Sequence, residues 1–541
     1  MDQNNEMNRF FFCLFTSLAL LSCTGPEPAN NGPAPVVLHR GNGAEPDTLD
    51  PHRSEETSSA EILRDLFEGL TTETVDSTVT PGVAERWTIS DDDTVYTFYL
   101  RPNARWSNGD RVTAEDFVFA FRRTLNPATA SSYAQTLYPI SNAKAVNTGE
   151  APLETLGVVA KDPSTLQVTL NAPTPYFLQL LNHSSAFPVH RPSVEEFGDG
   201  FTQPGRLVSN GAYVLDEWLV QSHIKILKNN HYWDSENVQI EEVYHYPTED
   251  IDAEFKRYRA GELDFTDQIP NSQFKWIREN LSADLKVEPY LSTYYYVFDL
   301  SEPPFDDVRL RQALTMVIDR EVLTEKVTGV GEVPAYSLVP RGVANYTAQR
   351  YSWADLPDVE RISIAQKLYR DAGYSDDNPL QVQIHYNTSE NHKKVAVAIS
   401  AMWKEALGVR STLLNEEWKV LLQTRKNRAN WAIMRFGWVG DFNDAYTFLE
   451  IMHSEHGQNT AGYNNPEYDR LTGAASREGD LATRRELMES AERIFMADYP
   501  ILPLYFYVSK HMVQPYVLGF RPNIMDHNYS RHYRIEARPQ N

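Results

Sequence analysis

The chain has 541 residues, of which 41% are hydrophobic and 23% are charged, a composition typical of folded proteins rather than disordered ones. A chain of this length exceeds what one hydrophobic core supports, so two or more lobes are expected. The net charge of −24 repels phosphate backbones and argues against nucleic acid as a partner.

The N-terminus has the pattern of a targeting signal. Residues 10–21 form an apolar run that is too short to span a bilayer but suits the core of a signal peptide. The run ends in Leu-Leu-Ser-Cys at 20–23, which resembles a bacterial lipobox. We therefore expect a lipoprotein signal peptide over 1–22, a lipid-modified Cys23 and a flexible tether over 23–35. An ordinary signal peptide followed by a chance cysteine is the alternative.

The first half of the remaining chain alternates between strand and helix patterns. Residues 36–40 read as a strand, and residues 59–70 carry apolar side chains at helical spacing. Alternating residues predict strands at 95–100 and 165–170. Between them, Thr113 is expected to cap a helix, with Asp116 completing a capping box.

The second half repeats this alternation. Strands are predicted at 382–386 and 432–436, on either side of a helix over 393–407 that ends at Gly408. A further helix is predicted over 482–495. Strands that alternate with helices indicate a mixed α/β fold.

Motifs for common chemistries are missing. The sequence has no phosphate-binding loop, no complete dinucleotide fingerprint, no Gly-x-Ser-x-Gly elbow and no His-Glu-x-x-His. His453 and His456 lack a nearby third ligand and read as a loop rather than as a metal site. Cys13 lies in the expected signal peptide and Cys23 would be acylated, so no thiol nucleophile remains. We expect no metal, no cofactor and no enzymatic activity.

Short stretches in a fixed order carry a resemblance that extends from about residue 36 to 535. They are residues 50–52, 64–70, 81–85, 106–109, 112–117, 210–213, 290–296, 304–309, 387–389, 417–419 and 435–438. In these stretches the chain resembles the oligopeptide-binding class of the family-5 extracellular solute-binding proteins, which serve bacterial ABC importers.

The resemblance implies a periplasmic-binding-protein-like α/β fold of the large three-domain type, in which two lobes close on the ligand by a hinge. Domain I would be discontinuous, with domain II inserted in it and domain III following. The implied boundaries are 36–67, 191–291 and 509–541 for domain I, 68–190 for domain II and 292–508 for domain III. The implied function is the capture of short peptides and their delivery to the permease subunits of the importer. The protein would be a monomer, lipid-anchored to a bacterial membrane and located in the periplasm or at the cell surface.

The resemblance also implies a set of ligand-binding residues. Asp441 matches the carboxylate that anchors the peptide's amino group, and Glu55, Glu56 and Thr57 match a segment that pairs with the peptide backbone. The other matching positions are Gly437 and Val439 in the opposite pairing segment; Tyr133, Trp418, Tyr290, Tyr295 and Tyr507 among the cleft aromatics; and Arg425, Arg435, His392 and Asn387 near the peptide C-terminus. Core packing is the alternative for each aromatic, and a structural salt bridge is the alternative for Arg435.

The chain departs from the resembling class at four positions. Ser292 and Val439 stand where a cysteine pair is expected, Val297 where an acid is expected, and Thr328 where a lysine is expected in or near the cleft. Ligand charge or length preference is therefore open. The alternatives are capture of a murein peptide or another solute, a peptide-sensing receptor, and a secreted hydrolase, for which no activated nucleophile is found.

Overall fold

The computed structural model describes residues 35–428 and 431–538. The expected signal peptide, Cys23 and all but the last residue of the tether lie outside these residues. Within the described ranges, no helix is both long and apolar enough to cross a membrane.

The first sheet has the strand order β1-β10-β9-β8, in which only β1 and β10 run parallel. Its strands are β1 (Val37–Gly41), β8 (Tyr213–Leu219), β9 (His223–Lys228) and β10 (Glu242–Tyr246). Helix α1 (Thr57–Leu66) shares a hydrophobic cluster with this sheet through Ile62, Leu63 and Leu66. The prediction that this helix continues to residue 70 is wrong, because Phe67 is extended and a Cβ on Gly69 would lie 2.5 Å from the Leu181 carbonyl oxygen.

The second sheet has the order β4-β5-β7-β6 and is antiparallel throughout. Its strands are β4 (Ala84–Ile89), β5 (Val95–Leu100), β6 (Val158–Asp162) and β7 (Thr165–Thr169). Helix α2 (Ala114–Leu125) packs on it, and the Asp116 carboxylate accepts hydrogen bonds from the Thr113 backbone (2.7 Å) and hydroxyl (2.9 Å), which confirms the predicted capping box. Short elements complete this region: β2 (Thr71–Glu73), β3 (Val79–Pro81), α3 (Ala143–Asn147), α4 (Phe177–Leu180) and α5 (Arg191–Phe197).

The third sheet has six strands in the order β12-β16-β11-β15-β13-β14. They are β11 (Leu285–Phe298), β12 (Val333–Pro334), β13 (Gln381–Asn387), β14 (Arg410–Glu416), β15 (Ile433–Val439) and β16 (Ile501–Met512). Its helices are α8 (Val308–Met316), α9 (Arg320–Val322), α10 (Asp358–Asp371), α11 (Glu390–Leu407), α12 (Trp418–Lys426), α13 (Tyr446–Leu449), α14 (Pro466–Ala475) and α15 (Leu481–Asp498). Gly408 ends α11 in the left-handed conformation, with a φ of 75°, as predicted.

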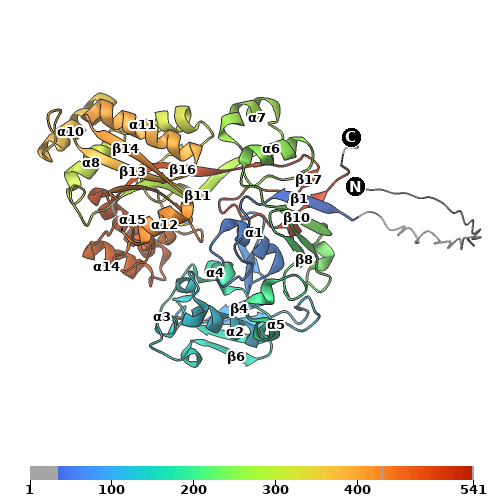
Figure 1. The fold of residues 1–541 in the computed structure, drawn as a ribbon. Coiled ribbons are helices and arrows are strands. Elements are labelled where there is room, and N and C mark those ends of the chain that lie inside the picture. Colours follow the sequence, from blue (N-terminus) through green and yellow to red (C-terminus); the bar gives the residue numbers. More distant parts are fainter. Residues whose placement is uncertain (1–34, 429–430, 539–541) are drawn as a thin grey trace, which may run out of the picture. The chain divides into compact units, whose positions relative to one another are not determined.

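Strands β11 and β16 form a long two-stranded ribbon (Figure 1). This ribbon links two hydrophobic clusters. At one end, Leu285, Val287 and Met512 pack with α6 (Ile251–Arg259) and α7 (Phe274–Asn280). At the other end, Leu291, residues 294–298, Ile501, Leu502, Leu504 and Tyr505 belong to the large hydrophobic cluster of the six-stranded sheet. The ribbon register shifts between Pro289 and Thr293, so the pairing is interrupted between the two clusters. Strands β17 (Val517–Leu518) and β18 (Arg534–Ile535) pair near the C-terminus.

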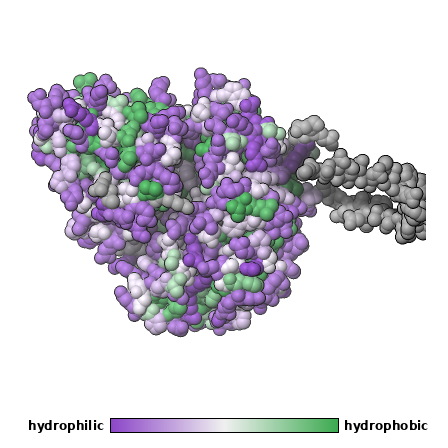
Figure 2. Space-filling view, in the orientation of Figure 1, coloured by the Kyte–Doolittle hydropathy of each residue, from purple (hydrophilic) through white to green (hydrophobic). Residues whose placement is uncertain are grey.

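The mixed α/β architecture predicted from the sequence is confirmed, and each predicted strand and helix is present within a few residues of its expected bounds. The face of the molecule in Figure 2 is largely hydrophilic, with hydrophobic residues in separate small patches.

Candidate functional site

Strand β15 has a free backbone edge along part of its length. On one side it pairs with β11 over its whole length, whereas β13 pairs only with Ile433 and Met434 on the other side. The Gly440 amide donates to the Leu291 carbonyl oxygen (2.8 Å), and hydrogen-bonded pairs alternate along an antiparallel ladder. Gly437 and Val439 therefore direct their N–H and C=O groups to the edge that no described strand occupies. An extended ligand can pair there as an added strand.

Asp441 follows the free edge directly. Its backbone amide donates to the Thr447 hydroxyl (3.1 Å), and its carboxylate has no ion-pair partner among the described residues. Burial raises the pKa of Asp441 to about 7. A carboxylate removed from water without a counter-ion is a suitable receptor for an ammonium group.

Glu450 adds a second acid beside Asp441. Burial raises the pKa of Glu450 to about 8, and the charges of Asp441 and Asp444 contribute. Arg484 neutralises Asp444 through two hydrogen bonds of 2.6 and 2.9 Å, which leaves Asp441 and Glu450 uncompensated. Sequence reasoning missed Glu450. The sequence feature that could have indicated it is its position as the one acid in the mostly apolar run over residues 446–452.

Arg435 stands in the same strand, six residues before Asp441. Its guanidinium donates to the Tyr507 hydroxyl (2.7 Å) and the Asn387 side-chain oxygen (3.3 Å), and lies 4.8 Å from the centre of the Tyr294 ring. No carboxylate within the described ranges pairs with it, and its Nε has no hydrogen-bond partner there. The structural salt bridge considered for Arg435 is therefore absent, and the cation remains available to an anionic ligand.

Tyr294 and His392 lie beside Arg435, whereas Arg425 and Tyr295 contact Phe436, the next residue of the strand. The Tyr294 hydroxyl lies 3.3 Å from His392 Nδ1, and burial together with the charge of Arg435 lowers the pKa of His392. Arg425 lies 4.9 Å from the centre of the Phe436 ring, and burial lowers its pKa. Tyr295 packs against Phe436 at 5.6 Å and is almost fully buried. Tyr294, which supports Arg435, was also missed, because nothing distinguishes it from its neighbours in the run Tyr294-Tyr295-Tyr296.

Tyr133 lies between Asp441 and the segment that contains Glu55. Burial raises the pKa of Tyr133, and the charges of Asp441 and Glu55 add to this effect, which places both carboxylates near its ring. The ring also packs at 4.6 Å against His183, and the Glu55 carboxylate accepts a hydrogen bond from Ser132. Three segments that are distant in sequence therefore meet around Asp441.

Within residues 35–428 and 431–538, the structure gives no hydrogen bond, ion pair or ring contact between these groups and Trp418, Thr57 or Tyr290. Trp418 begins α12 and is 46% exposed, and Thr57 is exposed at the start of α1. Tyr290 lies near Asp526, Arg64 and Glu61 instead.

The departures from the resembling class are resolved by burial and pairing. Ser292 and Val439 are direct cross-strand neighbours, and the Ser292 hydroxyl donates to the Trp438 carbonyl oxygen (2.9 Å). Val297 is in the core, and the buried Thr328 hydroxyl donates to the Glu332 carboxylate (2.8 Å), which also pairs with Lys510 (3.1 Å). Both side chains are buried, and the Thr328 hydroxyl is occupied by its bond to Glu332.

Comparisons with known proteins agree with this arrangement. Residues 78–460 match the family described as bacterial extracellular solute-binding proteins, family 5. Over 487 aligned residues the chain is 40% identical to the periplasmic oligopeptide-binding protein OppA of Salmonella typhimurium. The alignment covers 90% of this chain and 89% of that protein. The solved structure of the Escherichia coli murein tripeptide-binding protein MppA is 38% identical, with a TM-score of 0.86, and covers 93% of this chain and 99% of that one. The structure of Haemophilus influenzae OppA in complex with the peptide RPPGFSPFR is 37% identical, with a TM-score of 0.84 and the same coverage.

Proposed function

Because the chain belongs to the family-5 bacterial extracellular solute-binding proteins, we propose that it captures short peptides outside the cytoplasm and delivers them to the membrane subunits of an ABC-type importer. It acts as a binding protein rather than as an enzyme. Its relatives in the comparisons are binding proteins, and one solved neighbour holds a peptide.

One observation carries this proposal: the charges left unpaired in the site are the complement of a zwitterionic, extended ligand. Among the described residues, Asp441 is an anion without a cation and Arg435 is a cation without an anion, and the free edge of β15 lies between them. The six residues from Arg435 to Asp441 span at most about 20 Å. That distance matches an extended peptide of about six residues. A shorter peptide fits when the side chains of Arg435 and Asp441 both turn toward the ligand.

The Asp441→Ala variant tests the proposal. Removing one partner of a desolvated ion pair costs about 3–5 kcal/mol, so binding of tri- and tetra-alanine should weaken at least a hundredfold. N-acetylated peptides should also bind the unchanged protein poorly, because they lack the ammonium group. Isothermal titration calorimetry measures both effects.

The matched control is Asp91→Asn, which changes an exposed acid in a turn and should leave the affinity unchanged. Equal affinity for acetylated and free peptides, or full affinity in Asp441→Ala, would show that Asp441 is not the amine anchor.

We further propose the domain limits implied by the resemblance, with 68–190 as domain II and 292–508 as domain III. The hydrophobic clusters support the second limit, because the largest one draws its residues almost entirely from 291–505. The β11–β16 ribbon would then act as the hinge.

We also propose that Cys23 carries a lipid anchor, on the strength of the apolar run that ends in Leu-Leu-Ser-Cys. Cys23→Ala should release the protein from membranes or arrest its processing, as fractionation and immunoblotting would detect. Normal cleavage and membrane association of this variant would contradict the anchor.

A murein peptide is the second candidate ligand, because MppA aligns over 93% of this chain. Such a ligand would use the same amine anchor. Mass spectrometry of the ligand that co-purifies with the protein separates it from ordinary peptides.

A further inference from the structure

Glu450 is an acid of the site to which the binding of a simple peptide assigns no role. It directly follows the last residue of α13 and is partly buried. Within residues 35–428 and 431–538, its carboxylate makes no hydrogen bond and no ion pair. Removing an ionisable group from water without giving it a partner costs free energy, so the position of this carboxylate is not explained by the fold.

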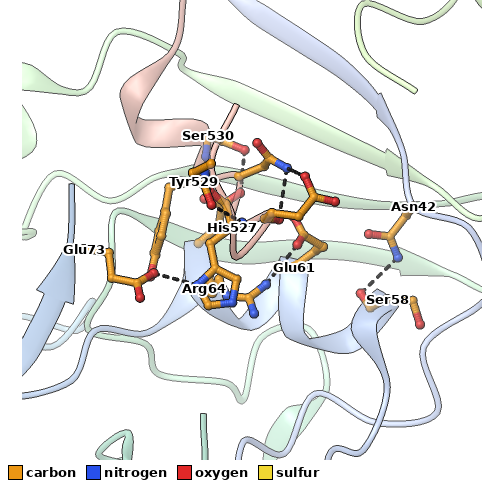
Figure 3. A network of polar contacts seen from close by, with 12 residues as sticks. Asn42, Ser58, Glu61, Arg64, Glu73, His527, Tyr529 and Ser530 are labelled. Atoms are coloured by element: carbon orange, nitrogen blue, oxygen red, sulfur yellow. Dashed lines mark hydrogen bonds and ion pairs between the residues drawn. The ribbon is translucent and has the colours of Figure 1, made fainter. Parts of the chain in front are cut away.

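Other acids that are shielded from water have partners. In the polar network around α1, the Glu61 carboxylate accepts a hydrogen bond from Arg64 (2.9 Å), and Glu73 bonds His527 (2.6 Å), as Figure 3 shows. The charges of these acids are compensated inside the fold and need no ligand. A cation from a ligand would supply the partner that Glu450 lacks.

The fold holds Glu450 next to the amine anchor. The Asp441 amide donates to the Thr447 hydroxyl (3.1 Å), and Thr447 precedes Glu450 by three residues in one helical segment. Residues three apart lie on the same side of a helix, so Glu450 shares the side that meets Asp441. A Cβ on Gly440 would lie 3.0 Å from the Thr447 methyl group, which shows how closely the strand end and the helix pack. The Asp441 charge contributes to the raised pKa of Glu450, in agreement with this proximity.

The surroundings of Glu450 offer aromatic rings but no free positive charge among the described residues. The guanidinium of Arg484 is already engaged by Asp444 through hydrogen bonds of 2.6 and 2.9 Å. The rings of Tyr176 and Tyr446 stack with their centres 5.5 Å apart. The Glu450 charge adds to burial in raising the pKa values of both tyrosines, so both rings lie near its carboxylate. An acid beside aromatic rings suits an alkylammonium group, whose charge the acid pairs and whose stem the rings cover.

We propose that Glu450 forms a subsite for a positively charged side chain on the first residue of the peptide, beside the Asp441 anchor for the α-ammonium group. The proposal rests on the peptide-binding function above. A single ammonium group compensates only one of the two acids, whereas an N-terminal lysine brings two ammonium groups on one residue. With a neutral first residue Glu450 keeps its proton, which its raised pKa of about 8 permits at neutral pH.

The test compares Lys-Ala-Ala and Ala-Lys-Ala, each with a free and with an Nε-acetylated lysine, by calorimetry at neutral pH. The unchanged protein should bind free Lys-Ala-Ala at least tenfold more tightly than its acetylated form, because only the free side chain carries a charge. Side chains alternate in direction along an extended peptide, so acetylation of Ala-Lys-Ala should change the affinity less than threefold. Glu450→Gln removes the charge and keeps the shape, and it should reduce the tenfold preference for free Lys-Ala-Ala to less than threefold.

The matched control is Glu486→Gln, which changes an exposed acid on α15 and should keep the tenfold preference. Each preference is a ratio measured within one protein, so an effect of the substitution on folding or on the α-ammonium group cancels. Should Glu450→Gln bind no peptide, the comparison of the two lysine positions in the unchanged protein decides. Equal binding of free and acetylated Lys-Ala-Ala, or a preference that survives in Glu450→Gln, would overturn the subsite and leave the proposed function standing. Failure of every peptide to bind the unchanged protein would overturn both.

Discussion

Asp441 and Arg435 are charged side chains in partly dehydrated positions without a counter-ion among the described residues. Such groups cost stability in the empty protein, because burial penalises the ionised form. A zwitterionic ligand removes this cost at both ends at once. With the proposed ligand bound, the stability that the fold loses at these two residues would be recovered as ligand affinity.

The raised pKa of Asp441, about 7, predicts a pH-dependent affinity. In the empty protein the carboxyl holds a proton below pH 7, and a bound ammonium favours the ionised form, so binding releases a proton. Affinity should therefore rise about tenfold from pH 5.5 to pH 7. It should fall again above about pH 8, where the peptide's own amino group loses its proton. Calorimetry in buffers of different ionisation enthalpy measures both the affinity and the proton release.

Glu450→Gln distinguishes which acid titrates. Because the pKa of Glu450 is raised to about 8, this residue is already protonated below pH 7, and the variant should keep the same rise in affinity. Tyr133 remains neutral throughout this range, since burial raises its pKa, and Arg484 remains paired with Asp444. A flat profile between pH 5.5 and pH 7 would contradict the assignment of Asp441.

Strand β15 is the element on which the site depends, because it supplies both the backbone edge and Arg435. Strand β13 pairs with only two residues of β15, Ile433 and Met434. The backbone of residues 435–439 is therefore unpaired on that side among the described strands. An exposed strand edge favours pairing with another chain. In this protein we propose that this property serves ligand binding.

Val439→Pro tests the edge. Proline removes the N–H that faces it, at a strand end where proline is tolerated, so peptide affinity should fall about three- to tenfold. Val439→Ala keeps the N–H and is the control. Calorimetry with tri-alanine gives the affinities, and an equal loss in both variants would mean that the side chain rather than the backbone contacts the peptide.

At the scale of the molecule, contacts join residues 176–179 to residues 442–446. The Tyr176 and Phe442 rings stack at 4.8 Å, and the Asn443 amide donates to the Gln179 side-chain oxygen (2.9 Å). With the proposed domain limits these contacts would link domain II to domain III, and we expect them to stabilise the ligand-enclosing arrangement.

Gln179→Ala should therefore weaken peptide binding two- to tenfold without touching the ligand, since apparent affinity scales with the fraction of binding-competent protein. Gln203→Ala, at an exposed side chain without hydrogen bonds in the described part of the chain, is the control. Unchanged affinity in Gln179→Ala would show that this contact plays no part in enclosing the ligand.

Local features were predictable from the sequence because their causes are local. The alternation over residues 95–100, the Thr113–Asp116 capping box and the glycine at 408 depend only on neighbouring residues, and the structure has all three. Asp441 and Arg435 were also named from the sequence, by resemblance to a family whose spacing this chain shares.

The remaining features depended on tertiary structure. Glu450 meets Asp441 only after the chain turns through α13, and the free edge of β15 exists only because β13 pairs with two of its residues. A cavity of about 420 Å³ beside the β11–β16 ribbon likewise exists only because Tyr290, Arg341 and Ile524, which are spread over more than 200 residues of sequence, meet there. Such contacts follow from strand register and the packing of distant segments, which leave no local pattern in the sequence.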